Sequence, residues 1–301
     1  MEILVTGGTV FASRFTAEYF AKKGHSVTVL NRGTRPQPAG VEALIGDRHD
    51  AKMLLCGRHF DAVLDITAYN AADVNGLLDA LDSVGTYVLL SSSAVYPESL
   101  PQPFRETQAV GANAVWGAYG TDKIAAESAL LQRVPDAYMI RPPYLYGPMN
   151  NVYREAFVFE CAERNLPFYL PKDGAMELQF YHISDLCRLI AKILEARPDT
   201  HIFNAGNPET ISVKEWVAAC YDVLGKKPDF ICVSDDIPQR SYFPFYDYEY
   251  RLDVEQMMNT APEITPLKTG LKQAYDWWKN NREAVVRKPL LNYIAEHLAS
   301  E

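Results

Sequence analysis

The sequence lacks the cysteine, histidine and leader patterns of a secreted or metal-binding protein. Its five cysteines are odd in number and scattered, with no C-x-x-C pair, which is typical of reduced thiols rather than of a disulfide framework or zinc site. Its six histidines include no H-x-x-x-H pair, so we expect no metal. The chain starts M-E-I-L-V-T-G without a basic leader, and no apolar run is long enough to cross a bilayer. We therefore expect a soluble, cytoplasmic protein that does not contact a membrane.

Excess positive charge is also absent. The chain has 29 Lys and Arg against 38 Asp and Glu, which gives a net charge of −9. This balance argues against a nucleic-acid surface held by phosphate contacts, although it leaves room for a locally basic groove. Hydrophobic residues make up 48% and charged residues 22%, a globular composition. At 301 residues, the chain could form one large domain, or a nucleotide-binding domain with a smaller lobe.

The first thirty residues predict a βαβ unit. Strands are expected over 3–6 and 26–30, with a Gly7-Gly8-Thr9 turn and a helix over 11–22 between them. A helix N-terminus that follows a glycine turn offers free N–H groups and a partial positive charge to a pyrophosphate. The first thirty residues are therefore typical of a dinucleotide-binding βαβ unit.

Residues 88–123 contain the candidate catalytic residues. Residues 88–90 read as a buried strand, and Ser91, Ser92 and Ser93 follow where parallel strands place their ligands. Tyr119 and Lys123 lie four apart, so they share one face of a helix. An ammonium one turn away favours the phenolate of a tyrosine, and a serine at the strand end can hydrogen-bond the oxygen whose proton moves.

Weaker patterns predict the remaining elements. We expect residues 232–250 to form a loop that lines the site, and a helical pattern from 267 to the end of the chain. Other strands are expected over 41–45, 62–66, 138–141 and 168–170, and helices over 70–81 and 150–164.

The motifs together resemble the extended short-chain dehydrogenase/reductase family, also described as the NAD-dependent epimerase/dehydratase family. The Ser-Ser-x-x-Val-Tyr motif ends at Tyr96, and Tyr-x-x-x-Lys follows it at Tyr119. The R-P-x-x-x-Y-G-P run that starts at Arg141 and the F-x-H-x-x-D-L segment at Phe180 are similar to family signatures. The resemblance covers almost the whole chain and is strongest over residues 1–148.

The resemblance implies a fold and a domain organisation. The fold class is α/β, a Rossmann-type doubly wound parallel sheet with a smaller C-terminal substrate lobe. Residues 1–148 would form the dinucleotide-binding domain, with segments near 181–205 returning to it. Residues 149–301 would form most of a discontinuous substrate lobe. The helix over 70–81 and the helix of Tyr119 would give a homodimer through a helical bundle.

The resemblance also implies roles for individual residues. Tyr119 would exchange the hydroxyl proton, Lys123 would hold the ribose and tune the phenol, and Ser92 would orient the substrate oxygen. The residues expected to bind substrate are Ser93, Tyr144, Arg240 and Arg251. The residues expected to bind NAD or NADP are Gly7, Gly8, Thr9, Val10, Phe11, Asn31, Arg32, Asp47, Asp65, Thr67, Ala68, Tyr119, Lys123 and Pro142.

Some of these positions depart from the family pattern or allow a second interpretation. Val10 and Ser13 stand where the family has its second and third glycines, and a β-branched residue there could crowd the pyrophosphate. Asn31 replaces the acidic residue typical of NAD binding, and Arg32 could pair with a 2′-phosphate, so NADP is slightly favoured. Asp47 could contact the adenine or cap a helix, and Arg32 could be a solvated loop residue.

The positions that bind substrate in the family also depart from the family pattern. Leu178 and Pro143 stand where nucleotide-sugar enzymes of the family have an arginine and an asparagine, which weakens the nucleotide-sugar assignment. Ser93 and Ala94 occupy the places of the Asp-Glu pair of dehydratases, so dehydration is disfavoured. The leading interpretation is an NAD(P)-dependent epimerase or reductase that acts on a sugar or nucleotide-sugar carbinol. A non-catalytic relative that binds RNA, as in chloroplasts, or a regulator that senses the NADP redox state remains the alternative.

Overall fold

The computed structural model describes residues 1–299 as two units, and the first contains a seven-stranded parallel sheet. This unit consists of Met1–Leu145, Tyr181–Pro208 and Leu252–Ile264. The strand order is β11-β6-β5-β4-β1-β2-β3. The strands are β1 (Glu2–Thr6), β2 (Ser26–Asn31), β3 (Glu42–Ile45), β4 (Ala62–Asp65), β5 (Thr86–Leu90), β6 (Tyr138–Arg141) and β11 (Ile202–Asn204).

Continuous apolar runs explain the central strands. Ile3, Leu4 and Val5 in β1 are fully buried, as are residues 62–64 of β4 and residues 88–89 of β5. A parallel strand that is covered on both faces loses the alternation of apolar and polar residues, because neither face meets water. The strand order reverses direction between β1 and β4, which confirms the predicted Rossmann-type doubly wound fold.

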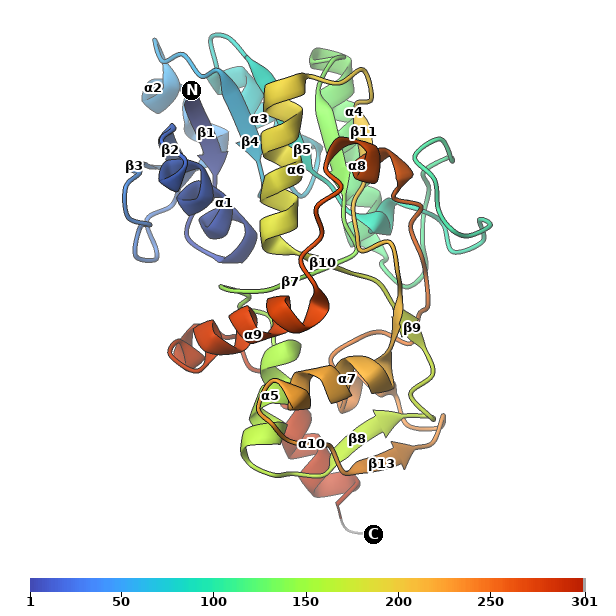
Figure 1. The fold of residues 1–301 in the computed structure, drawn as a ribbon. Coiled ribbons are helices and arrows are strands. Elements are labelled where there is room, and N and C mark those ends of the chain that lie inside the picture. Colours follow the sequence, from blue (N-terminus) through green and yellow to red (C-terminus); the bar gives the residue numbers. More distant parts are fainter. Residues whose placement is uncertain (300–301) are drawn as a thin grey trace. The chain divides into compact units, whose positions relative to one another are not determined.

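Helices cover both faces of this sheet (Figure 1). Helix α1 contacts α6, and α3 contacts α4 and the short turn η1, so the two pairs lie on separate faces. The helices of this unit are α1 (Phe11–Lys22), α2 (Lys52–Leu55), α3 (Ala71–Ala80), α4 (Ala118–Arg133), α6 (Ile183–Ala196) and α8 (Glu255–Thr260), with the 3-10 turns η1 (Arg48–Asp50) and η2 (Ser93–Val95).

The second unit consists of Tyr146–Phe180, Glu209–Arg251 and Thr265–Glu301. Strands β8 (Phe168–Pro171) and β13 (Phe230–Val233) pair in parallel, and β9 (Glu177–Leu178) and β12 (Ile211–Ser212) pair antiparallel. Its core is aromatic, with the ring of Trp216 stacked on that of Phe180 at 5.2 Å. The other elements of this unit are α5 (Glu155–Glu163), α7 (Val213–Asp222), α9 (Leu267–Trp278), α10 (Leu290–His297), η3 (Gln239–Ser241) and η4 (Arg282–Ala284). Two further short strands, β7 (Tyr144–Tyr146) and β10 (Phe180–His182), pair with each other.

Three predicted elements differ from the structure. The helix expected over 150–164 begins only at Glu155, because the side chain of Asn150 accepts the N–H of Val152 in a turn. The helical pattern predicted from 267 onward is wrong between α9 and α10, where Val286 pairs with Val152. The predicted 232–250 loop includes the end of β13 and the turn η3.

All five cysteines carry free thiols. No helix in the described part of the chain is both long and apolar enough to cross a membrane. Within residues 1–299, no group of three or more His, Cys, Asp or Glu side chains is arranged to hold a metal ion.

Candidate active site

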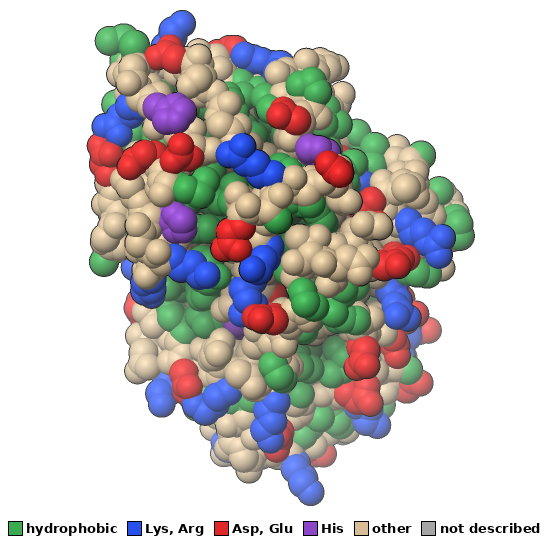
Figure 2. Space-filling view, turned by 45° about the horizontal axis from the view of Figure 1, so that its top comes forward, with side chains coloured by type: hydrophobic (Ala, Val, Ile, Leu, Met, Phe, Trp, Pro, Cys, Tyr) green, Lys and Arg blue, Asp and Glu red, His purple; other side chains and the backbone are tan. Residues whose placement is uncertain are grey.

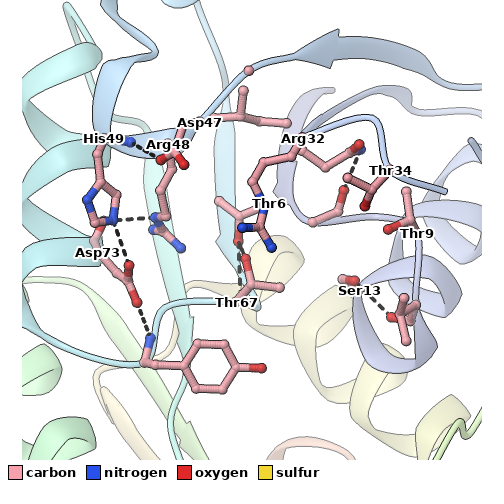
Figure 3. Close-up of a pocket in the computed structure, with 16 residues that line it drawn as sticks. Thr6, Thr9, Ser13, Arg32, Thr34, Asp47, Arg48, His49, Thr67 and Asp73 are labelled. Atoms are coloured by element: carbon pink, nitrogen blue, oxygen red, sulfur yellow. Dashed lines mark hydrogen bonds and ion pairs between the residues drawn. The ribbon is translucent and has the colours of Figure 1, made fainter. Parts of the chain in front are cut away.

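A cavity of about 430 Å³ opens in the first unit where β1, β2 and β4 end, beside the N-terminus of α1 (Figure 3). The carboxyl ends of parallel strands near a change in strand order are the usual ligand position in such sheets. The residues predicted to bind cofactor that line this cavity are Gly7, Thr9, Val10, Asn31, Arg32, Asp47 and Thr67.

Two glycines shape the turn from β1 to α1. Gly7 and Gly8 have φ values of 84° and 87°, in the left-handed region that side chains rarely adopt. A Cβ atom on Gly7 would lie 2.7 Å from Cγ2 of Thr67, and one on Gly8 would lie 2.5 Å from Cγ1 of Val29. The turn therefore requires glycine at both positions, and it brings bare backbone to the cavity wall at Gly7.

The N-terminus of α1 is suited to an anion. No side chain within the described residues caps it, and its first turn holds no acidic residue. Val10 precedes the helix with φ −138° and ψ 139°, an extended conformation that valine adopts without strain. The hydroxyl of Ser13 donates to the carbonyl of Val10 at 2.9 Å. The partial positive charge and N–H groups of the first turn thus fit a pyrophosphate despite the altered glycine pattern.

The amide of Asn31 fastens the loop after β2. Its Nδ2 donates to the carbonyl of Gly7 at 2.8 Å and to Gln37 at 2.9 Å, while its Oδ1 accepts from Gly33 N and from Gln37. An amide side chain has two donor hydrogens and two acceptor lone pairs, so this one is saturated. The side chain of the neighbouring Arg32 lines the cavity at this point.

A buried ion pair lies in the wall opposite α1. Asp65 is fully buried and accepts hydrogen bonds from Arg48 at 2.6 Å, Tyr87 at 2.6 Å and Thr6 at 2.7 Å. Burial alone lowers the pKa of Arg48, but the Asp65 carboxylate outweighs it and raises that pKa. Asp47 caps η1 by accepting the N–H of His49 at 3.0 Å, and it also lines the cavity.

Lys123 lies buried beneath the ends of β4 and β5. Its Nζ donates to the carbonyl of Ala68 at 2.7 Å and to that of Leu90 at 2.9 Å. Burial lowers the pKa of Lys123 to about 8, against the opposing effect of Asp65 and other nearby carboxylates. The ammonium lies 6.0 Å from the ring centroid of Tyr119, whose side chain is partly exposed. The predicted Tyr-x-x-x-Lys pair thus shares one face at the start of α4.

The predicted serine lies at the end of β5. The hydroxyl of Ser92 accepts the N–H of Ala94 at 3.2 Å, which caps η2, and Ser92 is partly buried. The N–H of Ser93 donates to the carbonyl of Pro142 at 3.0 Å, so these two predicted site residues are joined through their backbones. Tyr144 is buried in the same unit and packs edge-on against Trp116 at 6.2 Å.

Two predicted substrate residues belong to the second unit. Arg240 donates to the carbonyl of Pro244, and its guanidinium lies 4.5 Å from the ring centroid of Tyr246. Arg251 is exposed at the end of its segment.

The remaining predicted cofactor residues support the cavity without lining it. Gly8 packs on Val29, Asp65 holds Arg48, and the carbonyl of Ala68 accepts from Lys123. The other predicted cofactor residues outside the cavity wall are Phe11, Tyr119, Lys123 and Pro142.

The sequence analysis missed several polar residues of the wall. Arg48 could not be recognised, because its partner Asp65 is 17 positions away and leaves no local pattern. Outside the cavity wall, Glu127 was also missed, although it left a local signal, since it follows Lys123 by four positions and is buried on the same helix face. The other polar residues missed in the wall are Thr6, Ser13, Thr34, His49, Tyr69 and Asp73.

Comparison with curated proteins gives relatives with different functions. The chain is 29% identical to the chloroplast stem-loop binding protein of 41 kDa b from Arabidopsis thaliana, over 91% of this chain and 78% of that protein. It is 26% identical to UDP-glucose 4-epimerase of Corynebacterium glutamicum, over 91% of this chain and 95% of that protein.

Among solved structures, the chain resembles UDP-glucuronic acid 4-epimerase from Bacillus cereus in complex with UDP-glucuronic acid and NAD. The TM-score is 0.75 at 18% identity, and the match covers 93% of this chain and 99% of that one. At this identity the likeness concerns the fold.

A family model described as the NAD dependent epimerase/dehydratase family matches residues 3–206, more than half of the chain. The match confirms the resemblance and the enzyme class predicted from the Ser-Ser-x-x-Val-Tyr and Tyr-x-x-x-Lys motifs. The chain belongs to the NAD dependent epimerase/dehydratase family.

Proposed function

We propose that the protein is an NAD(P)-dependent epimerase or reductase that acts on the carbinol of a sugar or nucleotide sugar. The observation that carries this proposal is Lys123, a buried ammonium fixed to the ends of β4 and β5 one helical turn from Tyr119. Burying a lysine is costly, and a buried lysine with a depressed pKa next to a partly exposed tyrosine is typical of a functional site.

The residues present fit a dinucleotide. The glycine turn and the uncapped N-terminus of α1 would hold the pyrophosphate, and Asp47 would face the adenosine. Two protons of the Lys123 ammonium are used by carbonyl oxygens, and a third can be donated to a ribose hydroxyl. When bound, the nicotinamide supplies hydride transfer.

Residues of the chain itself would transfer the proton that accompanies the hydride. Tyr119 would take the proton from the substrate hydroxyl or return it, and the positive charge of Lys123 would stabilise the phenolate. Ser92 would donate a hydrogen bond to the same substrate oxygen and so orient it. Because Ser92 Oγ accepts from Ala94 N, its own hydrogen is directed away from that amide.

We propose NADP rather than NAD as the preferred cofactor. Arg32 lines the cavity, and it has no carboxylate within ion-pair distance in residues 1–299. Asn31, which stands where an acidic residue would repel a 2′-phosphate, is neutral and saturated. The guanidinium is therefore available for a phosphate.

The substrate proposal is supported by a structural relative. The Bacillus cereus structure contains UDP-glucuronic acid, which supports a nucleotide sugar as substrate. The assignment of Ser93, Tyr144, Arg240 and Arg251 as substrate-binding residues stays a prediction from the sequence. A homodimer through α3 and α4, and a cytoplasmic location, stay predictions. Light scattering on the purified protein tests the first.

Tyr119→Phe tests the proposed reaction. The variant keeps the ring but removes the proton that moves with the hydride, so turnover should fall by roughly a hundredfold or more while dinucleotide binding survives. The assay scans small carbonyl compounds and nucleotide sugars for a change in nicotinamide absorbance, which measures net reduction, and analyses nucleotide sugars by chromatography for epimers, because an epimerase leaves its nicotinamide in the starting oxidation state. Tyr19→Phe on α1 is the control and should keep full activity. Full activity in Tyr119→Phe would show that the triad is only an inherited scaffold.

A second candidate function is RNA binding without catalysis. The observation that favours it is the 29% identity to a stem-loop binding protein over 91% of this chain. A net charge of −9 opposes it.

A further inference from the structure

A buried ion pair joins α4 to the sheet beside the candidate catalytic residues. Glu127 on α4 and Arg141 at the end of β6 are only 4% and 3% exposed. The guanidinium meets the carboxylate with two bonds, Nε to Oε1 at 2.9 Å and Nη2 to Oε2 at 2.6 Å. This two-point geometry fixes the orientation of both side chains.

The pair continues into a network along the ends of three strands. The hydroxyl of Ser91, directly after β5, donates to Glu127 Oε1 at 2.5 Å. Arg141 Nη1 donates to the hydroxyl of Tyr96 at 2.8 Å, and that hydroxyl donates to Asn204 Oδ1 on β11 at 2.8 Å. One helix and the ends of β5, β6 and β11 are thereby connected through polar side chains.

Stability alone is a poor explanation for this network. Removing two charges from water costs about as much as their attraction returns, and apolar residues of similar volume often serve as well or better. What the network does fix is the rotation of α4. Tyr119, Lys123 and Glu127 are spaced by four and therefore share one helix face, while Ser91 is the neighbour of Ser92.

We propose that Glu127 is a positioning residue for the reaction: through Arg141 and Ser91 it holds the α4 face that carries Tyr119 and Lys123 against the strand end that carries Ser92. This inference rests on the proposed function, because it concerns the same three residues. Glu127 itself does not contact the reacting atoms.

Glu127 also contributes to the charge around Lys123. The groups that face the ammonium are Glu127 from its own helix, Asp65 from β4, Asp73 from α3, Arg48 from η1, and the rings of Tyr69 and Tyr119. The three carboxylates raise the pKa of Lys123 against the stronger effect of burial, while Arg48 lowers it. Removing the Glu127 carboxylate should therefore lower this pKa below its value of about 8.

The main variant combines Glu127→Leu with Arg141→Met, which removes both charges together and leaves neither buried alone. We expect it to fold, to bind dinucleotide and to keep KM, while kcat falls by about a hundredfold, the effect of misplacing reacting groups by about 1 Å. Arg133→Met is the matched control, because Arg133 is on the same helix and pairs with Asp79 at 2.7 Å on the surface. It should keep kcat.

A second readout needs no substrate. Lysine labelled with ¹³C at Cε is incorporated during expression, because the buried Lys123 amine is closed to chemical modification. The Lys123 signal is assigned by comparison with Lys123→Met, and its titration is followed by NMR. The midpoint should move to lower pH in the main variant and stay unchanged in Arg133→Met. A folded main variant with the parental midpoint, or with full kcat, would overturn the inference.

The outcomes separate this inference from the proposed function. If Tyr119→Phe keeps full activity, the proposed function fails; if Tyr119→Phe is inactive but the main variant is fully active, only the role of Glu127 fails. Should the main variant not fold, Ser91→Ala decides, because it removes one hydrogen bond to Glu127 and no charge. Ser91→Ala should lower kcat with an unchanged Lys123 midpoint, and an unchanged kcat would refute the positioning role.

Discussion

The proposed preference for NADP over NAD depends on the guanidinium of one residue. Arg32 lines the cavity next to an asparagine whose own hydrogen-bonding groups are all occupied. A charge-assisted pair with a 2′-phosphate is the strongest contact that such a residue can offer. NAD would receive no comparable contact there.

Arg32→Ala should therefore weaken NADP binding by about tenfold or more and change NAD binding little. Calorimetric titration of both cofactors measures it. Arg35→Ala, three residues further along the same exposed loop, is the control. Equal losses of NADP and NAD affinity in Arg32→Ala would show that Arg32 is not the selector.

Val10 is a residue whose effect the structure revises. The sequence suggested that its β-branched side chain crowds the pyrophosphate, so that Val10→Gly would tighten binding. Its extended backbone shows no strain at valine, and the turn is formed by Gly7 and Gly8 instead. Valine already fits the φ of this position, so glycine would relieve no strain and would only give the backbone more conformational freedom. We now expect the NADP affinity of Val10→Gly to stay within about twofold of the parent.

At the scale of elements, the turn between β1 and α1 is the most constrained segment of the site. Gly8 and Gly24 have almost the same φ, 87° and 85°, but only Gly8 has a neighbour, since nothing lies within 4 Å of a Cβ built on Gly24. A comparison of alanine variants at the two positions therefore separates the cost of backbone strain from the cost of steric crowding.

Gly24→Ala should cost about 1 kcal/mol of unfolding free energy from the left-handed backbone alone. Gly8→Ala should cost about 1–3 kcal/mol more, because its Cβ collides with Val29. Urea unfolding of both variants measures the difference. An equal loss in both would mean that β2 can move away from the turn at little cost.

Helix α6 begins at a histidine that must stay neutral. The side chain of His182 caps the helix by accepting the N–H of Ser184 at 3.3 Å, and burial lowers the pKa of His182 from 6.5 to about 4. Above pH 6.5 the imidazole is neutral in both the folded and the unfolded state, so the full contribution of His182 to the free energy of unfolding is present. Between pH 6.5 and about 4 the unfolded state takes up the proton first, and stability is lost.

His182→Asn keeps a capping acceptor and removes the titration. Between about pH 7 and pH 4 the parent should lose up to about 3 kcal/mol from this group, and the variant should lack that part of the slope. Urea unfolding at several pH values measures it, with the exposed His59→Asn as control. Identical slopes in the parent and His182→Asn would contradict the assignment.

Much of the first unit could be predicted from local pattern. The bounds of α1 and β6 agree with the prediction, because an amphipathic helix that closes at Gly24 and a short buried run are local signals. The turn before α5 and the break before α10 could not be predicted. The break before α10 depends on the pairing of Val286 with Val152, two residues far apart in the chain, and the turn before α5 also depends on the Asn150 side chain that accepts the N–H of Val152. Arg48 was missed in the site prediction for the same reason, because its partner Asp65, which was predicted, is distant in the sequence.

For the whole molecule, the main question is the choice between a catalyst and an RNA-binding protein. On the face shown in Figure 2, Lys and Arg side chains are interspersed with Asp and Glu rather than gathered in one basic area. RNA binding without such an area would depend on few phosphate contacts.

We therefore expect no RNA band shift at about 150 mM salt and at most weak binding at about 50 mM, because phosphate contacts lose affinity steeply with salt. Mobility shift with a structured RNA at both concentrations measures it, and the Arabidopsis relative serves as the comparison. Tight binding that resists salt would favour the second candidate function.

The first unit is assembled from three separate stretches of chain, and this has a consequence during synthesis. Strand β6 ends at Arg141, whereas its partner β11 in the second stretch spans Ile202–Asn204. At typical elongation rates the ribosome needs roughly ten seconds to cover the interval. During that time the edge of β6 that will pair with β11 is open, so nascent chains stalled between these points should be the ones that engage chaperones or aggregate.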